Sequence, residues 1–114
     1  MAEEYFKDGT VSGVGEYLDG ERHGPWTFYF KNGSVKARGS YDSGQLDGEW
    51  IWHRESGGLL QQGAFIDGLQ HGRWQRWHDT GNRLDDGFFE RGKKSGEWVT
   101  YDKAGVEVKR KVYR

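Results

Sequence analysis

The chain has 114 residues, of which 33% are hydrophobic, 16% aromatic and 31% charged, and its formal net charge is −1. This length fits one domain, the aromatic content argues against disorder, and the balanced charge gives a nucleic-acid partner little electrostatic support. The absence of cysteine excludes disulfides, thiolate zinc sites and a cysteine nucleophile. So polar a composition predicts a thin, extended architecture with both faces partly wet.

The N-terminal stretch MAEEYFKDG has neither the basic region nor the apolar region of a secretory signal. No apolar run reaches membrane-spanning length, so we expect a cytoplasmic chain. The stretch YFKDG at residues 5–9 is in register with YFKNG at residues 29–33. This correspondence predicts that half a repeating unit, residues 5–14, precedes the first whole one.

Glycine and tryptophan recur every 24 residues through the rest of the chain. Four units occupy residues 15–38, 39–62, 63–86 and 87–110, and a terminal strand at residues 111–114 begins a fifth. Each unit carries the pattern G-x-Y/F-x-x-G-x-x-x-G-x-W, followed by a further glycine. Repetition without insertions predicts a single repeat domain over residues 1–114.

Each unit is predicted to form two short strands. The first is aromatic, as in PWTFYF at residues 25–30, with Pro25 placed next to a loop. Asn32-Gly33 then marks a hairpin, because both central residues of the tightest turns need positive φ. The second strand, residues 34–42, runs to a glycine-flanked loop. Strands joined by tight connections pair antiparallel. The predicted fold class is therefore all-β, a single-layer, elongated, twisted antiparallel meander of 24-residue two-stranded repeats.

The recurrent tryptophans are predicted to be structural. A glycine inside a strand, such as Gly39, weakens that strand, and an aromatic ring from the neighbouring strand can shield the exposed backbone. The positions suited to this task are Trp26, Trp50, Trp74 and Trp98.

The 24-residue pattern resembles the MORN repeat over about residues 5–113. It is most similar to the MORN-variant repeats of bacterial proteins that are labelled antitoxin-like, the YwqK type. The resemblance implies an elongated, grooved antiparallel sheet that acts by binding. Known MORN proteins are mostly scaffolds and adaptors, some contact phosphoinositides or membranes, and enzymes with MORN repeats catalyse through another domain. The antitoxin-like label implies that some relatives neutralise a partner protein.

Variable positions in the central units are the candidate partner-binding residues. They are Trp52, Arg54, Arg76, Trp77 and His78. Since side chains alternate along a strand, we expect Trp52, Arg54, Arg76 and His78 on one face with the recurrent tryptophans, in units about 10 Å apart. Trp and Arg contribute much of the binding energy at protein interfaces. The prediction is a concave, aromatic and cationic patch for an acidic partner segment; variable, solvated decoration of a scaffold is the open alternative.

The C-terminal end is basic. Its candidate anionic-lipid contacts are Lys93, Lys94, Lys109, Arg110 and Lys111. Such residues attract an anionic membrane by about 1 kcal/mol each. Lysines at an open sheet edge also discourage edge-to-edge aggregation, and we favour this interpretation. Self-association through the exposed edges stays open as well.

No catalytic or metal-binding arrangement emerges from the repeat. His23 and His71 occupy equivalent loops two units apart, roughly 19 Å at the usual strand spacing, so one metal ion cannot join them. The stretch GVGEYLDG lacks the spacing of a phosphate-binding loop. We therefore expect no enzyme and no cofactor. The leading hypothesis is a protein-binding repeat module; a peripheral membrane or phosphoinositide-binding scaffold is the alternative, and a purely structural, consensus-like repeat is the third.

Overall fold

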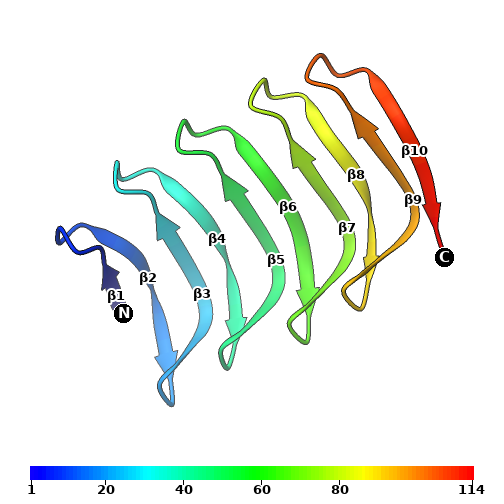
Figure 1. Ribbon diagram of the computed structural model, residues 1–114. Coiled ribbons are helices and arrows are strands. Elements are labelled where there is room, and N and C mark those ends of the chain that lie inside the picture. Colours follow the sequence, from blue (N-terminus) through cyan, green and yellow to red (C-terminus); the bar gives the residue numbers. More distant parts are fainter.

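The chain forms one sheet that every strand joins in sequence order. A computed structural model describes residues 1–114, and each strand pairs antiparallel with its neighbours along the chain (Figure 1). The strands are β1 (Ala2–Tyr5), β2 (Val11–Leu18), β3 (Glu21–Tyr29), β4 (Val35–Asp42), β5 (Gln45–His53), β6 (Leu59–Ile66), β7 (Leu69–Trp77), β8 (Arg83–Glu90), β9 (Lys93–Tyr101) and β10 (Glu107–Tyr113). The molecule measures 43 × 30 × 17 Å. The predicted all-β, single-layer meander is confirmed.

The two kinds of turn differ from the expectation. Asn32-Gly33 does close a hairpin, but only Gly33 has positive φ, at 88°. The turn spans three residues, Phe30 N–H donates to the Ser34 carbonyl at 2.8 Å, and the Asn32 side chain accepts from Ser34 N–H. Two positive φ values occur instead at the opposite row of turns, Asp19-Gly20, Ser43-Gly44, Asp67-Gly68 and Arg91-Gly92. Those two-residue turns replace the longer loops that we predicted, so the strands entering and leaving them are longer.

Pro25 lies inside β3 rather than beside a loop. The register between β2 and β3 shifts opposite this point, and Gly24, just before the proline, has a φ of 74°. Such a bulge is one of the few strand positions that tolerates proline, because the regular ladder of hydrogen bonds is interrupted there.

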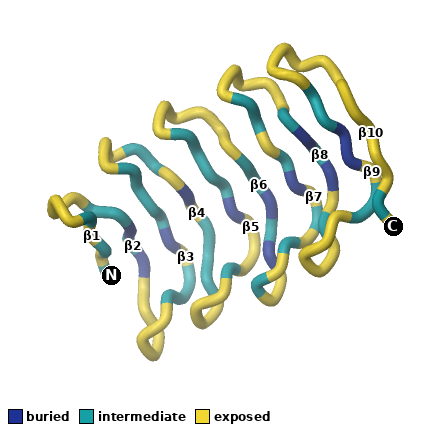
Figure 2. Tube along the Cα trace, in the orientation of Figure 1, coloured by how far each residue is buried: buried dark blue, intermediate teal, exposed yellow.

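The core is a band of tryptophans across the middle of the sheet. Trp26, Trp50, Trp74 and Trp98 are each at most 6% exposed, and the buried segments follow one another from strand to strand (Figure 2). Each indole lies on the backbone of a glycine in the preceding strand: Gly15, Gly39, Gly63 and Gly87 in turn. Each indole N–H also donates to a carbonyl of that strand, as Trp50 does to Ser40 at 2.9 Å. The predicted shielding of glycine by tryptophan is confirmed.

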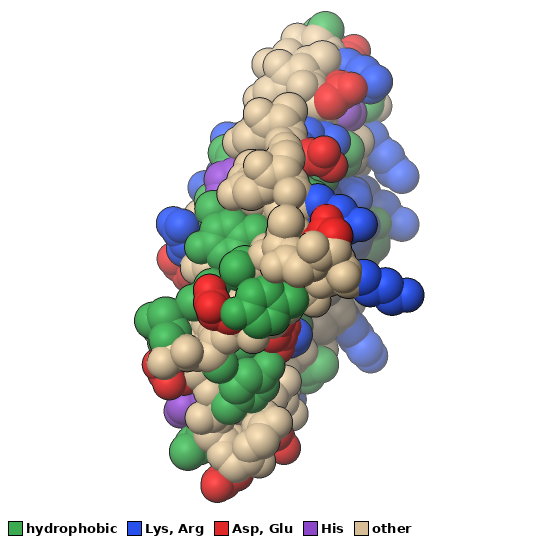
Figure 3. All heavy atoms as spheres, turned by 90° about the vertical axis from the view of Figure 1, so that its left-hand side faces the viewer, with side chains coloured by type: hydrophobic (Ala, Val, Ile, Leu, Met, Phe, Trp, Pro, Cys, Tyr) green, Lys and Arg blue, Asp and Glu red, His purple; other side chains and the backbone are tan.

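No second layer covers this sheet. In the view from the β1 end, hydrophobic side chains stand in the open beside charged ones (Figure 3). Tyr17 is 45% exposed and Leu18 48% exposed. Function must therefore be sought on the two faces and at the turns.

Candidate functional site

One face of the sheet, here called the aromatic face, carries the recurrent tryptophans and a second row of rings. That row consists of Tyr17, Tyr41, Phe65, Phe89 and Tyr113. Its rings meet the tryptophans edge to face, with centroids 5.2 Å apart for Tyr41 and Trp50. Edge-to-face packing is a favoured geometry of aromatic pairs. The rings thus bind neighbouring units together.

Successive tryptophans leave three gaps on the aromatic face. In the first gap Phe28 stacks between Trp26 and Trp50, at centroid distances of 5.7 and 6.3 Å. In the second gap Trp52 lies 5.7 Å from Trp50 and 5.8 Å from Trp74. The equivalent residue of the third gap, between Trp74 and Trp98, is Arg76. A ring therefore fills two gaps and a guanidinium-bearing chain enters the third.

The third gap holds an open hollow of about 300 Å³. We call this space the third-gap hollow. The residues that line it are Gln61, Gln70, Trp74, Arg76, Asp85, Phe89, Lys94 and Trp98. Arg76 does not fill the space, because its guanidinium turns to Asp85, with Nη2 2.6 Å and Nε 3.1 Å from the carboxylate. Indole and phenyl groups of three residues remain as walls.

One row of residues that pair across the sheet shows why the first two gaps are filled and the third is open. Reading across the sheet, the row is Gly13, Phe28, Ala37, Trp52, Gln61, Arg76, Asp85, Thr100 and Lys109. Its first half is apolar and closely packed, with Ala37 only 4% exposed. Its second half is polar or charged. This row thus belongs to the core at one end of the sheet and lines an open hollow at the other.

The hollow has an excess of positive charge. Asp85 is 5% exposed, and its carboxylate, by hydrogen bond and charge, raises the pKa of Arg76 above its ordinary value despite partial burial. This ion pair is internally neutral. The Lys94 ammonium lies 4.7 Å from the centre of the Trp98 ring, a cation–π contact, and takes part in no salt bridge. Lys94 therefore gives the hollow a net attraction for anions.

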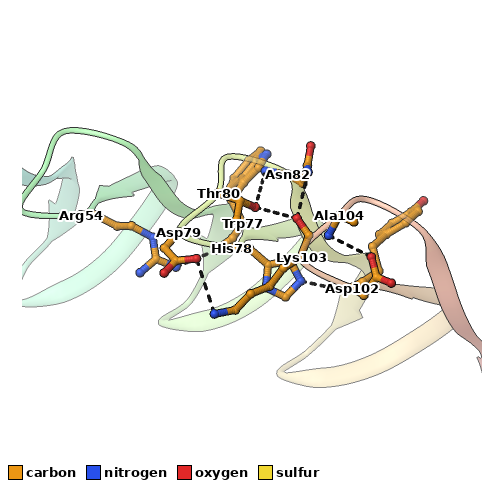
Figure 4. Close-up of polar contacts among 10 residues, drawn as sticks. Arg54, Trp77, His78, Asp79, Thr80, Asn82, Asp102, Lys103 and Ala104 are labelled. Carbon is orange, nitrogen blue, oxygen red and sulfur yellow. Dashed lines mark hydrogen bonds and ion pairs between the residues drawn. The ribbon is translucent and has the colours of Figure 1, made fainter.

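Arg54 and His78 lie at the row of three-residue turns and bind the backbone of the next unit. The Arg54 guanidinium donates to the Trp77 carbonyl at 2.9 Å, and His78 Nε2 lies 2.8 Å from the Tyr101 carbonyl (Figure 4). Both contacts bridge 23 residues in sequence. The Arg54 Nε atom is buried without a hydrogen-bond partner. These two side chains hold units together.

The same row of turns carries further contacts between units. Thr80 Oγ1 and the Asn82 amide both donate to the Lys103 carbonyl, at 2.8 and 2.9 Å (Figure 4). The Lys103 ammonium lies 3.7 Å from the Asp79 carboxylate. Polar residues in this row thus link adjacent turns.

The five predicted partner-binding residues do not form one cluster. Trp52 and Arg76 are brought together on the aromatic face, on either side of Gln61. Trp77 follows Arg76 in β7 and so points to the opposite face. Arg54 and His78 lie at the turns. Two facing positions vary together from unit to unit, and this signal was missed in the prediction from the sequence. The facing pairs are Phe28 with Ala37, Trp52 with Gln61, and Arg76 with Asp85.

The five predicted lipid contacts are also divided between two faces. Lys94 and Lys111 lie over aromatic-face rings, and Lys109 shares their face because strand side chains alternate. Arg110 lies on the opposite face and pairs with Glu97 and Glu107. Lys93 lies opposite Glu90 in the strand register, beside the Arg91-Gly92 turn, and on the face opposite to that of Lys94 because strand side chains alternate. Of the five residues, Lys94, Lys109 and Lys111 therefore lie on the aromatic face, and their positive charge continues from the third-gap hollow to β10.

No group of three metal-ligating side chains occurs in the chain. His23 Nδ1 accepts a hydrogen bond from Ser43 N–H in the next unit. The chain contains no helix of the length and apolarity that crossing a membrane requires.

Residues 22–43, which run from β3 through its turn and β4, match the family model described as MORN repeat variant. This match supports the predicted resemblance to the MORN-repeat family. The pairing of residues in the matched segment recurs at the 24-residue step in the following units, as the equivalent pairs Trp26–Gly39, Trp50–Gly63 and Trp74–Gly87 show. Among curated proteins none matches the chain. MORN repeats are in general binding or scaffold modules.

Proposed function

We propose that the chain is a non-enzymatic module that binds an acidic segment of a partner protein through the second half of its aromatic face. The observation that carries the proposal is the third-gap hollow, where aromatic walls and a free ammonium group lie together on an open surface. Trp and Arg at the centre of a surface are the residue types that dominate binding energy in protein interfaces.

The rigidity of the sheet also supports binding. Within its strands 57 backbone hydrogen bonds are formed, and the turns are linked from unit to unit. A surface that is ordered before it meets its partner loses little conformational entropy on binding. Of the predicted partner-binding residues, the proposal keeps Arg76, which lines the hollow, and Trp52, which lies next to Arg76 across Gln61. The attraction for the acidic segment comes from Lys94 and Lys109, which were predicted from the sequence as lipid contacts.

Neutralisation of a toxin-like protein is one specific version of this proposal. It follows from the resemblance to the YwqK-type, antitoxin-like repeat proteins. An anionic membrane is the competing ligand for Lys94, Lys109 and Lys111, and the experiment includes it.

The experiment compares two charge reversals of equal size on opposite faces. Lys94→Glu/Lys109→Glu changes the aromatic face, and Lys36→Glu/Arg38→Glu changes exposed positions of the other face. Each chain, with an unchanged melting temperature, is used to capture proteins from a lysate of the source organism. The captured protein is then purified, and its affinity is measured as a function of salt.

We expect a partner that binds the wild type and the Lys36/Arg38 variant alike but binds the Lys94/Lys109 variant about tenfold or more weakly. Its affinity should fall with rising salt, since the attraction is electrostatic. Equal binding to all three chains contradicts the proposal. So does binding only to vesicles of phosphatidylserine and phosphatidylcholine, with no protein retained.

A further inference from the structure

We infer that the third-gap hollow accepts one aromatic side chain from the partner, flanked in the partner's sequence by acidic residues. The inference rests on the proposed function and names the group that is recognised. The missing ring between Trp74 and Trp98 is supplied by the partner.

The other two gaps show what the missing group is. Phe28 is inclined by 19° to Trp26 and by 20° to Trp50, and Trp52 is inclined by 26° to Trp50 and by 33° to Trp74. Both gaps therefore hold a ring that is inclined by at most 33° to the indoles on either side. The third gap has the same two walls and no such ring.

The third gap is also uncovered at the level of the second row of rings. Over the first gap, the Arg22 guanidinium lies 4.9 Å from the Phe28 ring, and Leu46 packs against the core beside the second gap. The residue equivalent to both is Gln70, which lines the hollow. The entrance to the third gap is therefore polar and open.

The size of the hollow suits a single ring. At about 300 Å³ it stands at the small end of ligand pockets, which run from about 300 to 1,000 Å³. Trp74, Phe89 and Trp98 present surfaces on which a ring can stack or meet edge to face. An aliphatic side chain would fill the space but would form no stacked or edge-to-face contact with these rings.

The charges select the neighbours of that ring. Arg76 and Asp85 neutralise each other, whereas Lys94 is unpaired and Lys109 follows along the same row. A carboxylate beside the inserted ring reaches these ammonium groups, and Gln61 and Gln70 offer amides to the peptide backbone. The chemistry favours a Glu-Phe-Glu type of segment over a basic or purely aliphatic one.

Three blocked peptides test the inference on the full chain: Glu-Phe-Glu, Glu-Leu-Glu and Lys-Phe-Lys. The ¹⁵N-labelled indole N–H groups of Trp74 and Trp98 report binding by NMR, and that of Trp26 serves as internal control. We expect Glu-Phe-Glu to shift the Trp74 and Trp98 signals, with affinity about tenfold or more above that of the other two peptides. Equal shifts from Glu-Leu-Glu, or no shift from Glu-Phe-Glu, overturn the inference.

A variant that fills the gap from within provides the second test. Arg76→Phe/Asp85→Ala copies the arrangement of Phe28 opposite Ala37, and leaves no buried carboxylate unpaired. Its matched control is Arg73→Phe/Asp86→Ala, which alters a similar ion pair on the opposite face. We expect the first variant to remain folded and lose Glu-Phe-Glu binding, and the control to keep it.

The two proposals fail in different ways. If Arg76→Phe/Asp85→Ala still binds Glu-Phe-Glu as the wild type does, the inference that the peptide inserts its ring into the third-gap hollow is wrong. If that variant also binds the captured partner normally while Lys94→Glu/Lys109→Glu does not, the proposed function stands and only the inference falls. If neither variant affects the partner, the proposed function falls on its own.

Discussion

The Trp50 indole lies directly on the backbone of Gly39, in the space that a Cβ atom at this position would occupy. A Cβ atom added to Gly39 would meet ring atoms of Trp50. The Trp50 side chain is 2% exposed, and its indole N–H donates a hydrogen bond to the Ser40 carbonyl. Any larger residue at position 39 would therefore require the indole to move. This contact, repeated at each unit, takes the place of the second layer that a single sheet lacks.

Replacing Trp50 by Ala should lower the free energy of unfolding by about 3–5 kcal/mol, the usual effect of truncating a buried large aromatic residue. Gly39→Ala should also be destabilising, because the added methyl group meets the indole. Urea unfolding of each variant measures both effects. The matched control is Gly58→Ala, where the added carbon meets nothing within 4 Å; its stability should stay at or above that of the wild type. A Trp50→Ala chain with an unchanged unfolding midpoint would contradict the structural role.

The Arg76–Asp85 pair gives a second prediction. Arg76→Gln leaves the nearly buried Asp85 carboxylate without its charged partner, which should cost about 1–3 kcal/mol of unfolding free energy. Arg73→Gln, on the opposite face, should cost less than about 1 kcal/mol, because Asp86 is more exposed and keeps its ion pair with Arg83. Equal losses in the two variants, measured by urea unfolding, would show that the burial of Asp85 has no energetic role.

A third prediction concerns acid stability. The Arg22 guanidinium, hydrogen-bonded to Glu4 at 2.6 Å, lowers the pKa of that carboxyl below its ordinary value of 4.5. A lowered folded-state pKa stabilises the fold above pH 4.5, and this contribution is lost as the pH falls through the folded-state value. Glu4→Gln should therefore be less stable than the wild type at pH 7, and the difference should vanish towards pH 2.

Urea midpoints at a series of pH values measure this difference. Glu49→Gln is the control, since Glu49 is exposed and forms no salt bridge, and its midpoint should follow the wild type at every pH. A constant gap between Glu4→Gln and the wild type down to acid pH would contradict the assigned role of the ion pair.

The repeat predicted the fold well because each unit contains its own strand, turn and ring–glycine contact. The sequence predicted that a ring from a neighbouring strand shields Gly39, and the structure shows that this ring is Trp50. The turn types were harder. The sequence Asn32-Gly33 favours a two-residue turn, but the hydrogen bond from Phe30 to Ser34 adds a third residue and leaves positive φ to the glycine alone.

The candidate site was predictable only in part. Arg76 was identified because its position varies between units, and it does line the open hollow. Variation in sequence does not reveal that Arg54 and His78 reach the carbonyl groups of the next unit, because that contact depends on how the turns stack. The hollow itself depends on two paired changes, at the Phe28 and Ala37 positions, which face each other across one hairpin. Which residues face each other depends on the register that the three-residue turn sets, and the sequence did not predict that turn.

The contact of Arg54 with the next unit gives the last prediction. Arg54→Gln removes a hydrogen bond from a charged donor to the Trp77 carbonyl and should cost about 1.5–3 kcal/mol. Amide hydrogen exchange should rise most at residues 78–82, the turn that begins next to Trp77. Arg38→Gln, at an exposed position whose side chain forms no hydrogen bond, should change stability by less than about 0.5 kcal/mol. If Arg54→Gln keeps wild-type stability but loses the partner, Arg54 contacts the partner directly; if it loses stability and keeps the partner, Arg54 serves the scaffold.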